Sequence, residues 1–206
     1  MKVKEDFNPL FIYFGIMLLL QAGLSMILPS FVPEDYLTAV SFIVLYTIMF
    51  GTFIAVYWKK VLEDFKKLSW KTILIIIGIA AVMFFAIEFL ASLLPKAANE
   101  ESIIDIIHQC GIWTLLPIAL FGPFAEEMVF RYSFSTFIKK DTIFLIVSSL
   151  VFAAMHMSSI GIEMIVYVIM GLFLGLVYLK TNKNIAASTI AHVVNNFIEV
   201  IMLLFL

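Results

Sequence analysis

The stretch Ala125-Glu126-Glu127-Met128-Val129-Phe130-Arg131 places two carboxylates and a guanidinium inside a segment, residues 113–138, that is otherwise apolar enough to cross a bilayer. An ionisable side chain near a bilayer centre costs at least about 2.5–3.5 kcal/mol, so such residues point to a functional site. Glu127 and Arg131 lie four residues apart and share a helix face, where they can neutralise each other. A structural ion pair explains these two as well as a functional role does. Glu126 points about 100° away, so it needs a partner or a task outside its own helix.

The composition places the whole chain in a membrane. It is 63% hydrophobic and 14% charged, with a mean hydropathy of +1.09, whereas the apolar share of a soluble domain is nearer 45–50%. We therefore predict a single transmembrane domain over residues 1–206. A net charge of −2 gives no indication of a nucleic-acid partner.

Apolar segments long enough to form membrane helices follow one another along the chain. A span needs about 20 residues. The segments cover residues 9–28, 36–58, 72–94, 113–138, 142–157, 162–179 and 185–206. Residues 142–157 are short for a full crossing. We predict an all-α polytopic membrane protein, with about seven transmembrane helices enclosing a polar catalytic cavity.

The basic residues set the expected orientation. If the N-terminus is cytoplasmic, the inside segments carry Lys2, Lys4, Lys59, Lys60, Lys66, Lys67, Lys71, Lys139, Lys140, Lys180 and Lys183. The outside segments carry Lys96, and Arg131 remains in the membrane. This asymmetry follows the positive-inside rule for seven spans with the C-terminus outside. We also expect residues 59–71 to lie on the membrane surface as an amphipathic piece, and residues 96–111 to form a solvated acidic loop.

Two histidines fall within the apolar segments together with polar neighbours. His192 and Asn196 are four residues apart and share a helix face. At 1.5 Å per residue from the cytoplasmic helix ends, Glu126 and His156 both lie about 20 Å deep, and His192 about 10 Å. Glu126 and His156 should therefore meet. His192 can join them if its helix starts earlier, near Lys180, or is tilted.

This set of side chains suits the hydrolysis of an amide. A glutamate and a histidine that share one water can act as general base and general acid, and a histidine beside an asparagine amide can donate to an oxyanion. Alternatively, Glu126, His156 and His192 are sufficient ligands for a catalytic Zn²⁺. The chain contains neither the His-Glu-x-x-His helix of zinc proteases nor a Gly-x-Ser-x-Gly serine signature.

At these residues the chain resembles the CAAX-protease and bacteriocin-processing family of intramembrane proteases. That family carries a Glu-Glu-x-x-x-Arg, a Phe-x-x-x-His and a His-x-x-x-Asn motif, in this order. The chain reads Glu126-Glu127-Met128-Val129-Phe130-Arg131, Phe152-Ala153-Ala154-Met155-His156 and His192-Val193-Val194-Asn195-Asn196. The matched core runs over about residues 115–196.

The resemblance implies a helical membrane fold with a polar cavity open towards the cytoplasm. It implies that Glu126 and His156 activate a water, and that His192 and Asn196 bind the oxyanion. Glu127 and Arg131 would hold the shape of the cavity and tune Glu126. The family's members are often described as metalloproteases. We favour metal-free water activation here, with Zn²⁺ on Glu126, His156 and His192 as the alternative.

The sequence therefore predicts an intramembrane endopeptidase in a cell membrane, from a bacterial source by its composition. Its partners would be the lipid bilayer and a membrane-associated peptide or protein tail, with or without a lipid group. Two alternatives stay open. Buried Glu, His and Arg also serve proton relays in a small ion-coupled transporter, and a non-catalytic membrane scaffold could share the same fold.

Overall fold

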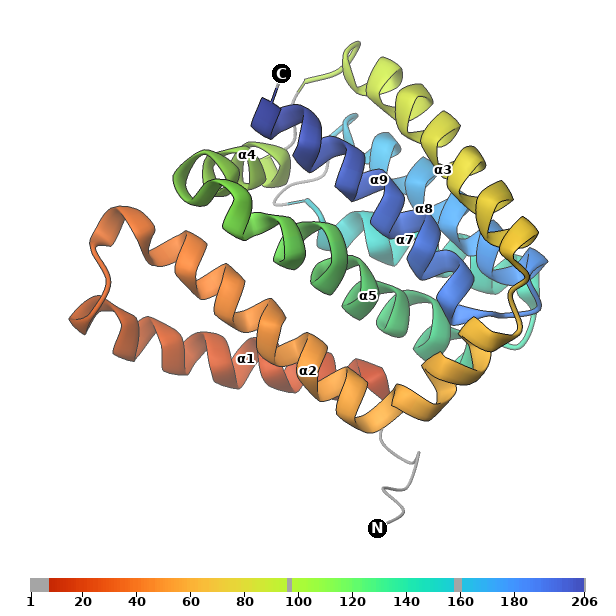
Figure 1. The fold of residues 1–206 in the computed structure, drawn as a ribbon, viewed down its shortest axis with the longest axis horizontal. Helices are drawn as coiled ribbons and strands as arrows, with labels where there is room; N and C mark the ends of the chain where they lie inside the picture. The colour runs from red at the N-terminus through yellow and green to blue at the C-terminus, as the bar shows by residue number, and fades with distance from the viewer. Residues whose placement is uncertain (1–7, 96–97, 158–160, 206) are drawn as a thin grey trace.

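The structure, a computed structural model, describes residues 8–95, 98–157 and 161–205, and within these residues it contains helices and turns but no strand (Figure 1). The α-helices are α1 (Pro9–Ile27), α2 (Leu37–Lys66), α3 (Trp70–Ala91), α4 (Ala98–Cys110), α5 (Gly122–Glu127), α6 (Phe134–Phe137), α7 (Asp141–Met155), α8 (Met164–Lys180) and α9 (Ile185–Phe205). Short 3-10 turns are η1 (Leu28–Ser30), η2 (Glu34–Tyr36) and η3 (Gly111–Thr114). The π-helical segments η4 (Pro117–Phe121) and η5 (Met128–Ser133) flank α5.

The predicted all-α polytopic membrane fold is confirmed. In the described part of the chain, four helical stretches are long and apolar enough to cross a membrane, namely Pro9–Ser30, Glu34–Lys66, Trp70–Ala91 and Ile185–Phe205. The bent pair Glu101–Thr114 and Pro117–Phe137 passes the same test only when taken together, which gives up to five crossings, and α7 and α8 are shorter apolar helices. Each of the apolar segments that we predicted overlaps a helix, but four or five helical stretches of the described residues, and not seven, are long and apolar enough to span.

The segment that carries Glu126 does not begin where we predicted. The chain turns by 103° between Glu101–Thr114 and Pro117–Phe137, so a single span over residues 113–138 is wrong at its start. The physical reason lies in Pro117, because proline has no N–H to donate and disfavours helical geometry in the residue before it. The stretch Pro117–Phe137 is the helical segment that holds the site.

Two expected loops are also helical. Within the acidic stretch predicted as a solvated loop over residues 96–111, residues 98–110 form α4, because Ile106 and Ile107 are buried against Ala39 and Val200. Asp105 and His108 stay exposed on α4. Lys96 and the N-terminal Lys2 and Lys4, which entered our charge count, lie outside the described residues, as does the side chain of Glu100.

The basic stretch at residues 59–71, predicted as an amphipathic surface piece, belongs to the end of α2 and the start of α3. Helix α2 continues through it to Lys66, and Asp64 on this turn is 2% exposed. The ammonium groups of Lys60 and Lys67 lie 2.5 and 3.2 Å from the Asp64 carboxylate. The other Asp64 contacts reach α9: Asp64 Oδ2 accepts the N–H of Ile185 at 3.0 Å, and its carbonyl accepts from the Asn184 amide at 2.8 Å. This turn therefore anchors the start of α9.

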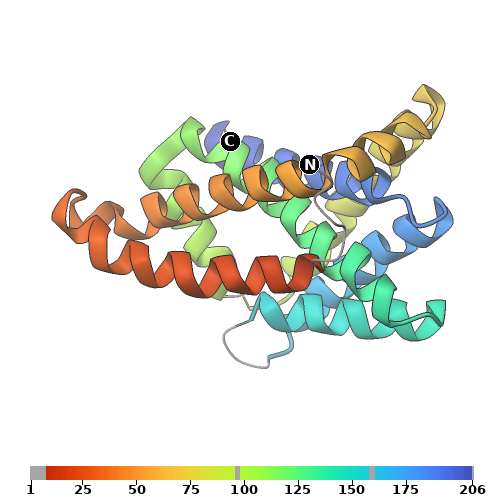
Figure 2. The same ribbon diagram turned by 90° about the horizontal axis from the view of Figure 1, so that it is seen from below.

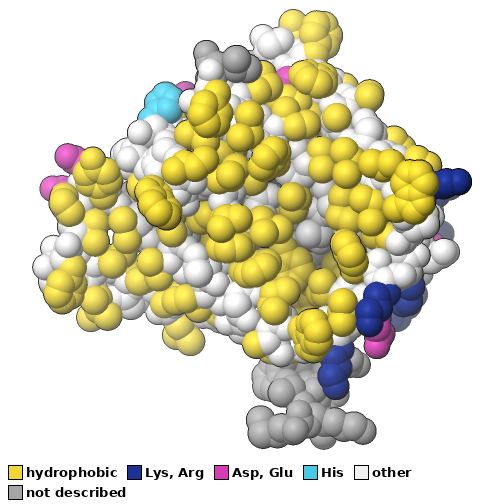
Figure 3. Space-filling view, in the orientation of Figure 1, with side chains coloured by type: hydrophobic (Ala, Val, Ile, Leu, Met, Phe, Trp, Pro, Cys, Tyr) yellow, Lys and Arg dark blue, Asp and Glu magenta, His cyan; other side chains and the backbone are white. Residues whose placement is uncertain are grey.

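The remaining helices surround α5 and α9. Helices α1 and α2 form a hairpin on one side, while α3 and α8 pack against α9 (Figures 1 and 2). Helices α7 and α8 meet at Gly171 and Gly175, where an added Cβ would lie 2.9 Å from Ser149 Cα and 2.6 Å from a Leu145 methyl. The face seen in Figure 3 is largely hydrophobic, with Lys and Arg side chains gathered at the edge where α2 turns into α3.

Candidate active site

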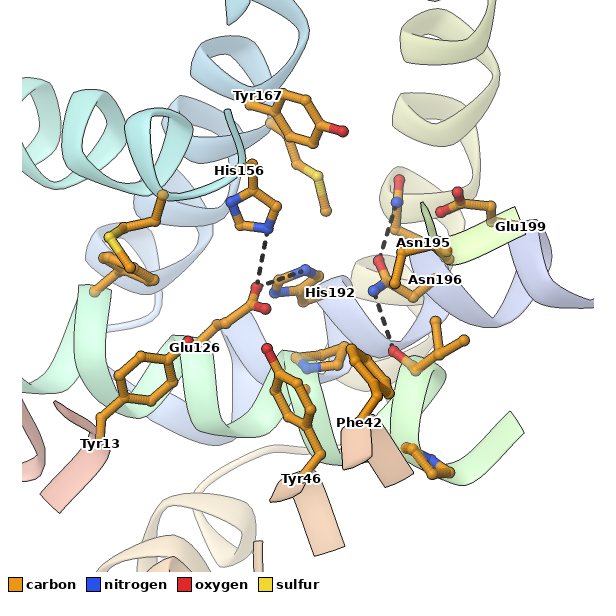
Figure 4. A pocket seen from close by; sticks show the side chains of 18 of the residues that line it. Tyr13, Phe42, Tyr46, Glu126, His156, Tyr167, His192, Asn195, Asn196 and Glu199 are labelled. Carbon is orange, nitrogen blue, oxygen red and sulfur yellow. Dashed lines mark hydrogen bonds and ion pairs between the residues drawn. The ribbon is translucent and has the colours of Figure 1, made fainter. Parts of the chain in front are cut away.

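Glu126 lies at the end of α5, between two imidazole rings from other helices. Its Oε2 atom is 3.6 Å from His156 Nε2 and 3.7 Å from His192 Nε2. Glu126 and His156 remain slightly exposed, with side chains at 13% and 17%, while His192 is 1% exposed. The expected meeting of Glu126 with His156 is thus present in the structure, and His192 joins them (Figure 4).

The His156 ring is held in one orientation at the end of α7. Its Nδ1 atom lies 2.8 Å from the carbonyl oxygen of Phe152, one helical turn earlier. Because a carbonyl can only accept, Nδ1 must carry a hydrogen, and Nε2 is left to face Glu126. The ring also packs between Phe152 and Tyr167, with centroids 4.3 and 4.9 Å away. His156 can therefore exchange a proton at Nε2 without moving.

His192 bridges the two adjacent carboxylates. Its Nδ1 atom lies 3.1 Å from Glu127 Oε1, while Nε2 faces Glu126. The separation at Nε2 is longer than a hydrogen bond, so the hydrogen bond of His192 is made to Glu127. This bond orients the ring so that Nε2 faces Glu126.

Glu127 and Arg131 form the ion pair that their spacing predicts. Arg131 Nε lies 3.4 Å from Glu127 Oε2, and both side chains are fully buried. Arg131 Nη2 also donates to the Gly171 carbonyl at 3.3 Å, and its guanidinium lies 5.3 Å from the centroid of the Phe152 ring. Through Arg131, the glutamate that holds His192 is connected to α8. This makes Glu127 and Arg131 candidates for positioning rather than for chemistry.

Asn196 lines the same cavity, but its amide also has a partner in the protein. Its Nδ2 donates to the Ile118 carbonyl at 3.2 Å. The Ile118 carbonyl lacks its usual backbone donor within the helix. The N–H of Gly122 donates to the Pro117 carbonyl in the π-helical turn instead, and the next residue, Pro123, has no N–H. The orientation of the Asn196 amide is fixed, since Ile118 oxygen can only accept.

Asn195 is a neighbouring polar residue to which we assigned no role from the sequence. Its Nδ2 donates to Asn196 Oδ1 at 3.4 Å, and its own Oδ1 is buried with no hydrogen-bond partner among the described residues. The residue is 5% exposed and lines the cavity. The signal that could have found it is its position three residues after His192, which puts the two on one helix face.

These side chains surround a cavity of about 270 Å³. Its other walls include Tyr13 of α1 and Tyr46 of α2. The Tyr46 hydroxyl points into the space beside Glu126 (Figure 4). Glu199, the acidic residue of α9, also lines it. The tyrosines come from the part of the chain in which the sequence motifs gave no signal.

Helix α9 begins at Ile185, as the apolar segment over residues 185–206 predicted, so His192 does not reach Glu126 through an earlier helix start near Lys180. Ile185 is fully buried. Asp64 and Asn184 hold this start inside the protein. Counting depth from Ile185 as if it lay at the membrane surface therefore placed His192 too shallow.

The zinc alternative requires Glu126, His156 and His192 to be arranged around one ion. Two imidazole nitrogens and a carboxylate are donors that zinc accepts. Yet within residues 8–95, 98–157 and 161–205 no group of three or more His, Cys, Asp or Glu side chains is arranged to hold one ion. The donor types suit zinc and their placement does not, so we route no step through a metal.

The helices and the cavity define a multi-pass membrane protein with a carboxylate–histidine site. Residues 108–198 match the family described as "Rce1-like: Type II CAAX prenyl endopeptidase Rce1-like". This region contains all the motif residues, and its match to the family model confirms the resemblance that the sequence motifs indicated.

One relative comes from Mycoplasma capricolum subsp. capricolum and is described as an uncharacterized protein. It is 30% identical over 161 residues, which cover 70% of this chain and 48% of that protein. The chain therefore spans about half the length of the curated relative that it matches. No solved structure matches the chain.

Proposed function

We propose that this protein is an intramembrane endopeptidase that cleaves a membrane-associated peptide or protein tail by water attack on an amide. The observation that carries the proposal is the convergence of His156 Nε2 and His192 Nε2 on one oxygen of Glu126, inside a cavity between apolar helices. The family match supports a protease of the CAAX type.

In this proposal Glu126 and His156 share the attacking water. The carboxylate takes a proton as the water oxygen bonds to the substrate carbonyl carbon, and the same proton passes to the leaving amine as the C–N bond breaks. His156 holds the water at Nε2, since its Nδ1 is fixed by Phe152. The partial exposure of both side chains leaves them open to water from the cavity.

His192 and Asn196 are the proposed donors to the oxyanion. Donors of this kind typically contribute 10²–10³ in rate each. Glu127 keeps a hydrogen on His192 Nδ1 and stabilises the protonated ring, and Arg131 neutralises Glu127 in turn. Both would act through His192 and not on the substrate.

We also propose one transmembrane domain with its protease core at about residues 115–196, in a bacterial cell membrane with the N-terminus cytoplasmic. The clustering of Lys60, Lys66 and Lys67 at the α2–α3 turn supports this orientation. Cysteine accessibility to a membrane-impermeant reagent, with cysteines placed at Lys67 and at Glu34 in a Cys110→Ser background, tests it. Labelling of the Lys67 position from the outside of intact cells would contradict it.

The test of the function uses protein purified in detergent and a quenched-fluorescence peptide library that includes lipidated members. Wild type should cleave some peptides, and Glu126→Gln should not. Glu63→Gln, which changes an exposed carboxylate at the end of α2, is the matched control and should cleave as wild type does. Equal cleavage by Glu126→Gln would contradict the proposal.

Elemental analysis of the same samples separates the two mechanisms. Metal-free cleavage that chelators do not affect supports the glutamate mechanism. Stoichiometric zinc that is lost in Glu126→Ala, His156→Ala and His192→Ala, together with activity, would replace it by the metal mechanism. Proton-coupled uptake in liposomes without any cleavage would favour the transporter alternative.

A further inference from the structure

A groove of about 440 Å³ runs between α1 and α2, next to the proposed catalytic cavity. The two hollows share Met17, Phe42 and Tyr46 as lining residues, so they meet at these side chains. From there the groove extends along the hairpin towards Pro29 and Leu37 at its turn. A substrate held at Glu126 could therefore continue directly into it.

The groove contains polar side chains that have no hydrogen-bond partner among the residues that the structure describes. Gln21, Thr38 and Ser41 line it, and none of their side chains is hydrogen-bonded to any residue that the structure describes. Ser25 also lines the groove, but its hydroxyl is satisfied by the carbonyl of Ala22 at 2.8 Å. Gln21 and Thr38 are exposed, which makes them accessible to a molecule in the groove.

Of these residues, Gln21 has the largest free-energy cost of placement in a membrane. It stands 12 residues after Pro9, the first residue of α1, which is about 18 Å along the helix and near the middle of a hydrocarbon core about 30 Å thick. A primary amide without a hydrogen-bond partner is energetically unfavourable in such surroundings. A polar side chain kept at this depth indicates a polar ligand.

We infer that the groove binds an extended segment of the substrate polypeptide beside the bond that is cut. This inference rests on the proposed function. A protease must bind its substrate unwound around the scissile amide, and in a membrane the backbone N–H and C=O groups of an unwound segment need partners. The Gln21 amide donates and accepts, as do the two hydroxyls, so they can satisfy such a backbone.

The polar side chains also favour a peptide over a lipid chain as occupant. A hydrocarbon chain gains nothing from an amide or a hydroxyl and would be bound better by a wholly apolar groove. The apolar residues Leu24, Leu28 and Leu45 would contact the substrate's side chains.

The first experiment uses Gln21→Leu with the peptide that wild type cleaves fastest in the library. Loss of one or two hydrogen bonds that are made in both the ground and transition states should raise KM about tenfold and leave kcat unchanged. If Gln21 merely faces lipid, the substitution should leave KM unchanged and raise the thermal stability instead. Leu19→Ala, on the exposed side of α1 outside the groove, is the control and should leave KM unchanged.

The second experiment identifies the contact with the backbone. Ester bonds replace single amides of the peptide, one at a time and outside the scissile bond, which removes one N–H at each position. In wild type one of these replacements should raise KM about tenfold, and in Gln21→Leu the same replacement should have no further effect. Thr38→Val, which keeps the shape of the side chain, should likewise abolish the effect of an ester replacement at another position of the peptide.

The outcomes separate this inference from the function on which it rests. Wild type that cleaves no peptide contradicts the proposed function. Wild type that cleaves, with KM unchanged in Gln21→Leu and Thr38→Val, contradicts the groove assignment and leaves the function standing. A lower KM of Gln21→Leu for lipidated peptides would contradict a peptide occupant and assign the groove to the lipid chain.

Discussion

His192 Nδ1 lies 3.1 Å from Glu127 Oε1, and both side chains are almost completely buried. This contact makes the second glutamate of the pair a partner of the histidine rather than a second base. It also fixes the side of the ring that faces Glu126, 3.7 Å away at Nε2. The consecutive glutamates thus have different environments: one faces the cavity, and the other supports a ring.

Replacing Glu127 by Gln should be more damaging to the fold than replacing Glu126 by Gln. Arg131 would then be a buried cation without its counter-ion, which costs about 3–5 kcal/mol of unfolding free energy. Thermal unfolding in detergent measures the loss. In the double variant Glu127→Gln with Arg131→Met, much of the stability should return because the unpaired charge is gone, whereas activity should stay low because His192 lacks its anionic partner. Full recovery of activity would contradict the positioning role.

The start of α9 offers a test of how the site is held. Asp64→Ala removes the acceptor of the Ile185 N–H and leaves Lys60 without its ion pair. We expect a loss of about 1–3 kcal/mol in the free energy of unfolding. Activity should fall as well, because a shift of α9 would displace His192. Glu63→Ala, at the preceding exposed residue, should change neither. An unchanged melting temperature in Asp64→Ala would show that the anchor contributes nothing.

The contact between α7 and α8 predicts unequal effects of two similar substitutions. Gly171→Ala would place a methyl 2.9 Å from the Ser149 Cα, where backbone must move, and should cost about 1–3 kcal/mol. It would also displace the carbonyl that Arg131 bonds. Gly175→Ala meets the end of the flexible Leu145 side chain and should cost less. Equal melting temperatures would contradict this packing.

The two asparagines of α9 should differ in kinetics. Asn196→Ala should lower kcat about 10²–10³-fold, because it removes a proposed oxyanion donor. Asn195→Ala removes a neighbour that bonds the Asn196 oxygen, and should lower kcat about tenfold or less. Equal losses of kcat in single-turnover assays would contradict this division of roles.

The sequence predicted the all-α membrane fold because hydrophobic runs of span length are a direct signature of the bilayer. The spacing of four residues was sufficient to predict the ion pair between Glu127 and Arg131. The meeting of Glu126 with His156 followed from equal depth in the membrane. These features follow from the length of the apolar segments and from residue spacing within them, both of which a single sequence contains.

Other features depend on contacts between distant segments, which spacing does not reveal. The buried start of α9 follows from Asp64, more than a hundred residues away, and the depth of His192 could not be estimated without it. The chain bends before Pro117, where we had predicted a straight span. Helix α4 forms where we had predicted a loop, because Ile106 and Ile107 are buried against other helices. The bridge from His192 to Glu127 joins residues on separate helices.

Cleavage by the Glu126→Gln variant is the most decisive measurement. The substitution keeps the size and the hydrogen-bonding shape of the side chain and removes its capacity to take a proton from water. If Glu126 activates the water, the variant should stay folded and lose cleavage of the library peptides by at least about 10²-fold, while Glu63→Gln cleaves as wild type. A folded Glu126→Gln protein that cleaves at the wild-type rate would contradict the proposed mechanism.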